Sequence, residues 1–320
     1  MEFSLKEIYK DYFKIGAALN TENVDTCKDI ILKHFNSITC ENAMKFADTE
    51  PAEGQFTFTD ADKIYGFAKD NNIPVRGHNF VWHQAVPDWL FKNADRETLL
   101  RRLENHVKAL TERYPDIYCW DCINEGIDDR DEYLRKTPWL EIIGEDYFGE
   151  AFKIAAKYTD KQLFYNDYNE FDPQKRKKII KKVKEIRESG ARIDGIGLQC
   201  HLGLNCEVDF DEIKRGLEEY AELGFKLQIT EHDVSNYPYS DREMHMAPTF
   251  EEYKKQTGIF KEFFKILREY KNEIETVTFW GVSDNTCWLN YFPVEGRKNG
   301  GLLFDENHEP KEGFYAICDF

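Results

Sequence analysis

Two glutamates stand out as a pair of carboxyl groups that could act on one bond. Glu125 and Glu231 each follow directly on a short, mostly apolar stretch of the chain. Paired carboxyl groups suit glycoside hydrolysis, in which one protonates the leaving oxygen while the other attacks the anomeric carbon or activates a water. One group must then be protonated while the other is ionised, so their environments must move their pKa values apart.

The polar neighbours of both glutamates fit this chemistry. Asn124 directly precedes Glu125 and is placed to hydrogen-bond a sugar hydroxyl. His201 could steady the Glu231 carboxylate, with Asp233 orienting the imidazole ring. Either glutamate alone is most simply an exposed loop charge, but the pair with these neighbours favours a catalytic site.

Aromatic residues in the expected loops support the same interpretation; they are Trp82, Tyr168, Trp280 and Trp288. Sugar rings present apolar C–H faces that stack on aromatic rings, while their hydroxyl groups need fixed polar partners. A place in the hydrophobic core explains any single tryptophan equally well. Four aromatic residues near one pocket rim favour a carbohydrate site.

A repeated pattern of short strand and longer helix must position these residues. The expected strands are 13–17, 37–40, 74–78, 118–124, 162–166, 193–199, 226–231 and 276–280. Apolar residues at helical spacing fill segments between them, and strands that alternate with helices imply a parallel sheet. Eight such units predict a single α/β domain over residues 1–320, a (β/α)8 TIM barrel.

The active groups of such barrels lie at the carboxyl ends of the strands. The polar and aromatic residues that follow the expected strands are Glu41, Asn42, Lys45, His78, Trp82, Asn124, Glu125, Asn166, Tyr168, Gln199, His201, Glu231, Asp233 and Trp280. Scattered surface polarity would not coincide with strand ends this often, so we expect these side chains to share one pocket.

A basic run over residues 175–184 allows two interpretations. Its members are Lys175, Arg176, Lys177, Lys178, Lys181, Lys182 and Lys184. They could form an anion-binding patch, but they lie opposite the apolar residues of the same predicted helix. We therefore expect the solvated outer face of a barrel helix.

The composition limits the possible partners. The chain has 320 residues, with 43 Lys and Arg, 60 Asp and Glu, and a net charge of −17. This acidity argues against a nucleic acid or an anionic membrane as partner, because phosphate would be repelled. No apolar run approaches the roughly 18 residues of a membrane span. The oligomeric state stays open, with a monomer as the expectation.

The N-terminus and the cysteines bear on the compartment. The first residues are polar and acidic and lack the apolar stretch of a signal peptide. Cys119 and Cys122 have CxxC spacing, but residues three apart on a strand point to opposite faces and should not bond to each other. We expect buried free thiols and a cytoplasmic location; a signal peptide upstream of Met1 would instead indicate secretion.

Metal and phosphate sites are the rival classes. His78, His83, His201 and the stretch 231–233 could supply metal ligands, but the chain has no His-x-His after its first strand and no HExxH. The glycines of 299–301 lie too far downstream for a phosphate loop and precede no helix start. We therefore expect neither a metal nor a phosphate ligand.

Eight motifs spread over about residues 10–318 belong together. They are FKIGAA at 13–18, TCENAMKF at 39–46, RGHNFVWH at 76–83, WDCINE at 120–125, NDYN at 166–169, GLQCH at 197–201, ITEHD at 229–233 and TFWG at 278–281. In this set the chain resembles glycoside hydrolase family 10, the endo-β-1,4-xylanases.

The resemblance implies a retaining double displacement on xylan or xylo-oligosaccharides that needs no cofactor. Glu125 would be the acid/base and Glu231 the nucleophile, with carboxyl groups about 5–5.5 Å apart. His201 and Asp233 match the network that holds the nucleophile.

The other motif residues match sugar-binding positions of the family. Asn124 and His78 match binders of the sugar at the cleavage site, where Trp280 would be the platform. The cluster for the next sugar toward the non-reducing end is Glu41, Asn42 and Lys45. Trp288 resembles a lid residue that disfavours a C6 hydroxymethyl group. Further pocket contacts would be Trp82, Tyr168 and Gln199.

Four positions depart from the family pattern. Ala85 replaces a usual Gln, Leu202 a common aromatic residue, and Gly300-Gly301 a usual Trp. These three predict a weaker grip on outer sugars. His232 stands where Leu or Met is common, and its place beside the nucleophile could shift the pH profile.

Two alternatives remain open from the sequence. A related barrel could act on β-1,4-glucan or mannan, since the catalytic pair is the same. A non-catalytic xylan-binding barrel is the other, although both carboxylates and their polar neighbours are intact.

Overall fold

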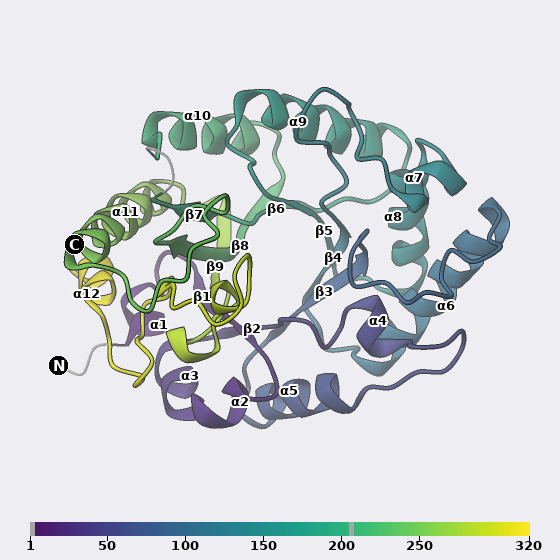
Figure 1. Cartoon of the computed structure of the whole chain (residues 1–320). Coiled ribbons are helices and arrows are strands. Elements are labelled where there is room, and N and C mark those ends of the chain that lie inside the picture. Colours follow the sequence, from purple (N-terminus) through teal and green to yellow (C-terminus); the bar gives the residue numbers. More distant parts are fainter. Residues whose placement is uncertain (1–3, 205–207) are drawn as a thin grey trace.

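Eight parallel strands close into a barrel, as the alternation of strands and helices predicts (Figure 1). The structure is a computed structural model that describes residues 4–204 and 208–320. The barrel strands neighbour one another in the order β6, β5, β4, β3, β2, β1, β9 and β8, and β8 pairs with β6 to close the ring. The described strands are β1 (Lys14–Leu19), β2 (Ser37–Cys40), β3 (Val75–Val81), β4 (Cys119–Asn124), β5 (Gln162–Asp167), β6 (Gly195–Leu198), β7 (His201–Gly203), β8 (Lys226–Ser235) and β9 (Ile274–Phe279).

The expected strands agree with the described ones to within a few residues at each end, and the ends of 193–199 and 226–231 differ for an identifiable reason. β6 is shorter than expected because Cys200 adopts a left-handed backbone with a φ of +56°, and the short strand β7 follows it. β7 pairs in parallel with the last residues of β8, so β8 continues four residues beyond its predicted end. The register of this extra pairing sets His201 opposite Asp233.

Helices surround the barrel and cover its outer face (Figure 1). Their bounds are α1 (Leu5–Ile8), α2 (Asn23–Thr26), α3 (Lys28–His34), α4 (Phe46–Thr49), α5 (Thr59–Asp70), α6 (Arg96–Arg113), α7 (Pro138–Ile143), α8 (Tyr147–Tyr158), α9 (Pro173–Glu188), α10 (Phe210–Ala221), α11 (Phe250–Glu269) and α12 (Glu312–Cys318). Two 3-10 turns, η1 (Asp284–Thr286) and η2 (Trp288–Asn290), follow β9.

Helix α9 begins at a strong start signal. The Asp172 carboxylate accepts from the backbone N–H groups of Gln174 and Lys175, both at 2.9 Å, and so satisfies two donors that have no partner within the helix. Pro173 occupies the first helical position, where its missing N–H costs nothing. These local signals fix where the basic run starts.

The basic run of α9 is only partly the solvated face that the sequence predicts. Its exposed members are Lys177, Lys181 and Lys184. Lys175, Arg176 and Lys182 are buried, because long aliphatic stems lie along neighbouring elements while the charged ends reach carboxylates. Arg176 pairs with Glu219 at 3.0 Å and Lys182 with Glu185 at 2.6 Å. The prediction of a uniformly solvated face is therefore wrong for these three residues.

A buried ion pair occupies the barrel interior beneath the strand ends. Arg76 of β3 pairs with Asp121 of β4, and neither side chain is exposed. Arg76 Nε also donates to Gln228 Oε1 at 2.9 Å, and the second Asp121 oxygen lies 2.7 Å from His78 Nδ1. Buried charges need partners of opposite sign to offset the loss of water. The pair thereby fixes the ring of His78.

The cysteines of the described ranges are free, as expected for Cys119 and Cys122. The buried ones are Cys27, Cys40, Cys119, Cys122, Cys200 and Cys287, and Cys318 is partly buried. Cys206 lies outside the described residues. Within residues 4–204 and 208–320, no helix is both long and apolar enough to cross a membrane.

The packing of β3 against β4 yields a prediction for Gly77. A Cβ added at this residue would lie 2.1 Å from the ring of Trp120, which is buried and stacked on Phe80. The ring has no free space to enter, so Gly77→Ala should lower the free energy of unfolding by about 1–3 kcal/mol or more. Urea unfolding followed by circular dichroism measures this.

Gly66 provides the matched control. It lies inside α5, and nothing lies within 4 Å of an added Cβ. Gly66→Ala should raise the free energy of unfolding by about 0.5–1 kcal/mol, because alanine loses less backbone freedom in a helix. Equal stabilities for the two alanine variants would contradict this account of the β3–β4 packing.

Candidate active site

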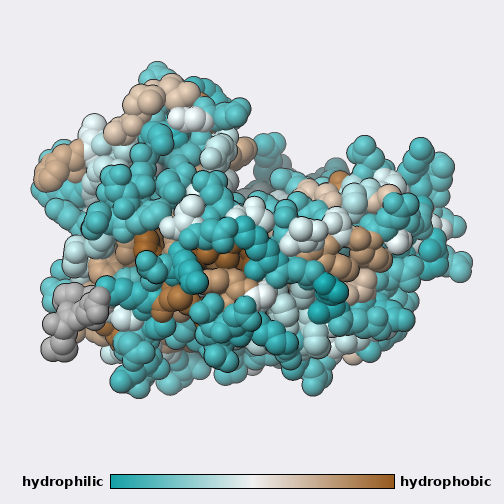
Figure 2. All heavy atoms as spheres, turned by 90° about the horizontal axis from the view of Figure 1, so that it is seen from below, coloured by the Kyte–Doolittle hydropathy of each residue, from teal (hydrophilic) through white to brown (hydrophobic). Residues whose placement is uncertain are grey.

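A cleft of about 780 Å³ opens at the carboxyl ends of the barrel strands. Seen from below, the upper edge of the molecule is hollowed between two raised parts, while most of the surface is hydrophilic (Figure 2). The predicted residues on the cleft wall are Glu41, Asn42, Lys45, His78, Trp82, Asn124, Glu125, Tyr168, Gln199, His201, Glu231, Trp280 and Trp288. The two other predicted residues lie directly behind the wall, Asp233 against His201 and Asn166 against Glu231.

Left-handed backbone turns follow three neighbouring strands at this face. Glu125 after β4, Asn169 after β5 and Cys200 after β6 have φ values of +57°, +51° and +56°. Residues other than glycine seldom adopt this conformation, which costs about 1–3 kcal/mol each and persists where surrounding contacts impose it. The first of these turns lies at one of the two predicted catalytic glutamates.

The Glu125 carboxyl group lies among amides and other acids. Its Oε1 accepts from Asn124 Nδ2 at 3.2 Å and from Gln199 Nε2 at 3.1 Å. Burial raises the pKa of Glu125, and the negative charges of Asp167 and Glu231 raise it further. The Gln199 hydrogen bond lowers the pKa but does not cancel these effects. The protonated form is therefore favoured, as a proton donor requires.

The Glu231 carboxyl group has the opposite surroundings. Its Oε1 accepts from Asn166 Nδ2 at 2.7 Å, and its Oε2 lies 3.5 Å from His201 Nε2. Burial alone would raise the pKa of Glu231, but the His201 hydrogen bond and the charges of His78, His201 and Lys45 lower it to about 2. The group is therefore ionised, as a nucleophile must be.

An amide chain joins the two carboxyl groups. Asn166 Nδ2 donates both to Glu231 and, at 2.8 Å, to Asn124 Oδ1, while Asn124 Nδ2 donates to Glu125. The Thr230 hydroxyl donates to Asn166 Oδ1 at 2.7 Å and sets the orientation of that amide. The sequence placed Asn166 at a strand end but did not predict this bridging position.

His201 and Asp233 form the predicted support of the Glu231 carboxylate. His201 Nδ1 lies 3.0 Å from Asp233 Oδ2, and Trp288 Nε1 donates to the same oxygen at 2.7 Å. Burial would lower the pKa of His201, but the charge of Asp233 and the hydrogen bonds to Asp233 and Glu231 raise it to about 10. The ring is therefore a cation beside the nucleophile.

A second polar cluster lies at the end of β2. Glu41 accepts from Asn20 Nδ2 at 2.9 Å, and Lys45 Nζ donates to Asn42 Oδ1 at 2.8 Å. The Lys45 ammonium group also lies 4.7 Å from the centre of the Trp82 ring. Asn20 lines the cleft and was not predicted, because it follows β1 as an isolated amide without a motif.

Aromatic rings form the rest of the wall. The Trp280 ring contacts His78 edge-on, with centroids 5.2 Å apart, while Trp288 stacks on Phe292 at 5.7 Å. Phe292 and Tyr291 are 55% and 60% exposed and also line the cleft. The sequence missed this pair, as it missed Gln84, Tyr239 and Thr286, and it gave Asn169 only as the last residue of the NDYN motif.

His232 does not act on the nucleophile in the way that its sequence position suggests. Successive residues of a strand point to opposite faces, so His232 packs outward among the phenylalanines of α11 and β9. Its Nδ1 lies 2.9 Å from the Cys200 carbonyl oxygen, and burial lowers its pKa to about 4. A neutral ring on the far face does not supply charge to the cleft, and an effect of His232 on the pH profile stays a prediction.

The other departures lie away from the cleft wall of the described structure. Ala85 and Leu202 are partly exposed and directly follow Gln84 and His201, which line the cleft. Gly300 is buried with a φ of +66°, and an added Cβ would lie 2.7 Å from the Tyr253 hydroxyl. A large side chain therefore has no room there. The weaker grip on outer sugars stays a prediction.

The ion pair behind Glu231 yields a prediction for His201. In the folded protein its pKa is about 10, above the ordinary value of 6.5. The stability that the charged ring contributes is therefore complete below pH 6.5 and is lost as the pH rises through about 10. Asp233→Asn removes the main partner and should lower the His201 pKa by about 1–3 units.

Histidine titration by NMR measures this shift, and His83 serves as the internal control. Burial and the charge of Arg135 lower the His83 pKa to about 4, and Asp233→Asn should leave that value unchanged. A His201 ring that titrates near its ordinary value in the unsubstituted protein would contradict the proposed pairing.

Comparisons with known proteins agree with this geometry. The sequence model described as "Glycosyl hydrolase family 10" matches residues 4–320. An endo-1,4-beta-xylanase A of Caldicellulosiruptor saccharolyticus is 44% identical over 100% of this chain and 96% of its own length. An endo-1,4-beta-xylanase of Geobacillus stearothermophilus is 42% identical over 99% of this chain and 98% of its own length.

Solved structures resemble the chain equally closely. Xylanase XynB from Paenibacillus barcinonensis, complexed with a conduramine derivative, has a TM-score of 0.96 and 42% identity over 99% of each chain. A mutant in complex with xylotriose has a TM-score of 0.96 and 42% identity, covering 99% of this chain and 100% of that chain. With the barrel, the predicted motifs and these matches in agreement, the chain belongs to glycosyl hydrolase family 10.

Proposed function

We propose that this chain is a retaining endo-1,4-β-xylanase, which cleaves internal β-1,4 links of xylan or xylo-oligosaccharides. The observation that carries the proposal is the pair of buried glutamates on one cleft whose pKa values are shifted in opposite directions. The names of the relatives and the complex with xylotriose support xylan as the substrate class.

The first step forms a covalent intermediate. The Glu231 carboxylate attacks the anomeric carbon, and the bond from that carbon to the glycosidic oxygen breaks. Glu125 gives its proton to the departing oxygen, which leaves as a sugar hydroxyl. His201 and Asn166 hold the two Glu231 oxygens, so the attacking group is already oriented.

The second step returns the enzyme to its starting state. The Glu125 carboxylate takes a proton from a water, which attacks the anomeric carbon and displaces Glu231. The negative charge of Glu231 raises the pKa of Glu125. When Glu231 forms the ester with the sugar it loses this charge, so the pKa of Glu125 falls at the step in which Glu125 must act as a base. Two inversions at one carbon retain its configuration.

The wall residues divide between the sugars on either side. We assign Asn124, His78 and Trp280 to the sugar that is cleaved, and Trp288 to a position above it. The β2 cluster of Glu41, Asn42 and Lys45 then binds the next sugar toward the non-reducing end. Trp82, Tyr168 and Gln199 supply further contacts, and His201 with Asp233 supports the nucleophile.

Product analysis tests the proposed function. The protein should release reducing ends from xylan and from linear xylo-oligosaccharides, with polymer cleaved into short mixed products. Faster hydrolysis of carboxymethylcellulose or mannan than of xylan would favour the related glucanase or mannanase. Binding to xylan without release of reducing ends by a folded protein would favour the non-catalytic barrel.

Substitution of the two glutamates tests their roles. Glu231→Ala should abolish turnover while the protein stays folded, because the attacking atom is gone. Glu125→Gln should lower kcat on xylan by about 10²–10⁴-fold, the usual contribution of a general acid/base. Glu188→Gln, an exposed residue at the end of α9, is the control and should leave kcat unchanged. Unchanged activity in Glu231→Ala would overturn the nucleophile assignment.

A further inference from the structure

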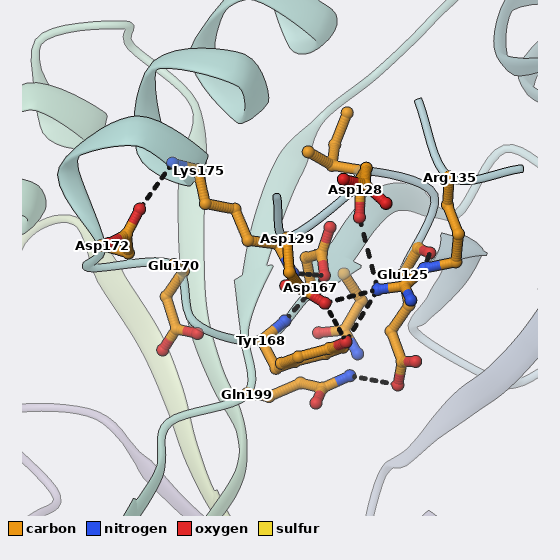
Figure 3. Close-up of polar contacts among 12 residues, drawn as sticks. Glu125, Asp128, Asp129, Arg135, Asp167, Tyr168, Glu170, Asp172, Lys175 and Gln199 are labelled. Carbon is orange, nitrogen blue, oxygen red and sulfur yellow. Dashed lines mark hydrogen bonds and ion pairs between the residues drawn. The ribbon is translucent and has the colours of Figure 1, made fainter. Parts of the chain in front are cut away.

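A charged network with a buried lysine at its centre lies beside Tyr168 and Glu125 (Figure 3). At its centre is Lys175 of α9, whose side chain is 1% exposed. Its Nζ lies 2.6 Å from Asp129 Oδ1 and 2.9 Å from Asp167 Oδ1, and 3.7 Å from the centre of the Tyr168 ring. One ammonium group thus contacts two segments, the loop after β4 at Asp129 and the end of β5 at Asp167 and Tyr168.

The same network holds Tyr168 by its hydroxyl group. Arg135 Nη2 donates to that oxygen at 2.7 Å, and the hydroxyl donates in turn to Asp129. Asp129 also pairs with Arg135 at 3.1 Å, and the backbone N–H of Tyr168 donates to Asp167 Oδ1 at 2.9 Å. The tyrosine is therefore fixed at its backbone, its ring face and its hydroxyl.

Arg135 connects the network to the acid/base residue. Its Nε donates to the backbone carbonyl of Glu125 at 2.9 Å, and its backbone N–H donates to the Gly126 carbonyl at 3.0 Å. Glu125 adopts the left-handed backbone with a φ of +57°. Such a strained conformation persists only where neighbouring contacts impose it. Arg135 supplies one of those contacts.

The charges of this network balance within it. Lys175 and Arg135 supply two positive charges, and Asp129 and Asp167 supply two negative charges. Buried charges are retained when partners of opposite sign replace the lost water. If Lys175 lost its charge, Arg135 would be the remaining cation of the network, and Asp129 and Asp167 would both act on it.

We propose that Lys175 is a positioning residue for the acid/base step: through Asp129 and Arg135 it holds the backbone at Glu125, and through Asp167 and its ring contact it holds Tyr168. The inference rests on the proposed function. Lys175, Asp129, Arg135 and Asp167 lie outside the cleft wall of the described structure, so they act through Glu125 and Tyr168.

The leaving group separates this role from a general structural one. Proton transfer needs a distance of about 2.6–3.2 Å between donor and acceptor, so a small displacement of the Glu125 carboxyl group disables it. A sugar hydroxyl is a poor leaving group and needs that proton. Dinitrophenolate leaves without one. A positioning defect at Glu125 therefore slows cleavage of xylotetraose and spares that of dinitrophenyl β-xylobioside.

The test compares kcat/KM of Lys175→Met on these two substrates, since kcat/KM reports the first chemical step. We expect a fall of about 10²-fold on xylotetraose, the size of effect that a misplacement of about 1 Å produces, and little change on dinitrophenyl β-xylobioside. The ratio of the two kcat/KM values is the decisive readout, because loss of folded protein lowers both equally.

Lys182→Met is the matched control. Lys182 lies two turns further along α9, is also buried, pairs with Glu185 at 2.6 Å and faces the Tyr133 ring at 4.7 Å. The partners of Lys182 in the described structure are Glu185, Tyr133 and Phe148, none of which belongs to the network. The ratio of the two kcat/KM values should therefore match that of the unsubstituted enzyme.

Asp129→Asn keeps the inference testable if Lys175→Met does not fold. The Asp129 side chain is 27% exposed, and an amide of nearly the same shape removes its charge and one of its two acceptor oxygens. It should show the same selective loss on xylotetraose. An unsubstituted enzyme that cleaves neither substrate overturns the proposed function. An active enzyme whose foldable network variants keep the original ratio overturns the positioning role of Lys175.

Discussion

The site depends on one electrostatic constraint: two nearly buried carboxyl groups face a single cleft. Two such groups resist ionising together, so the surroundings decide which one keeps the proton. Around Glu231 the structure gathers a cationic imidazole, an ammonium group and an amide donor. Glu125 instead faces Asp167 and the negative Glu231. This asymmetry sets one group as acid and the other as nucleophile before a substrate arrives.

The charges that serve the nucleophile are compensated one layer further out. His201 is paired with Asp233, and His78 with Asp121, which Arg76 neutralises in turn. Buried ion pairs of this kind are weak contributors to stability, because desolvation offsets much of their attraction. They do hold dipoles and charges in place before the reaction, so that no reorganisation is needed as charge develops. The barrel interior therefore serves orientation more than stability.

Strand-end positions were the part of the site that could be predicted. Each barrel strand ends at the same face, so residues such as Glu125, His201 and Glu231 could be assigned to one pocket without knowing any distance. Several residues of the site were nevertheless missed or only partly understood. Tyr291 and Phe292 come from a long loop after β9, and Asn166 was noticed as a strand end without its bridging role. Lys175 was expected to be exposed to solvent. Helical periodicity shows on which face of a helix a residue lies, whereas the burial of that residue depends on which other elements pack against the face.

By itself, the sequence determined the alternation of strands and helices, the chemical types at the strand ends and the motifs of the family, since these are properties of residues close together in the chain. Only the tertiary structure decided the register of β7 on β8, the outward side of His232 and the direction of the two glutamate pKa shifts. Those depend on groups that approach from distant segments: Asp167 beside Glu125, and His201 and Lys45 beside Glu231. The electrostatic energy of two charges depends on the distance between them in space, and that distance cannot be read from their separation along the chain.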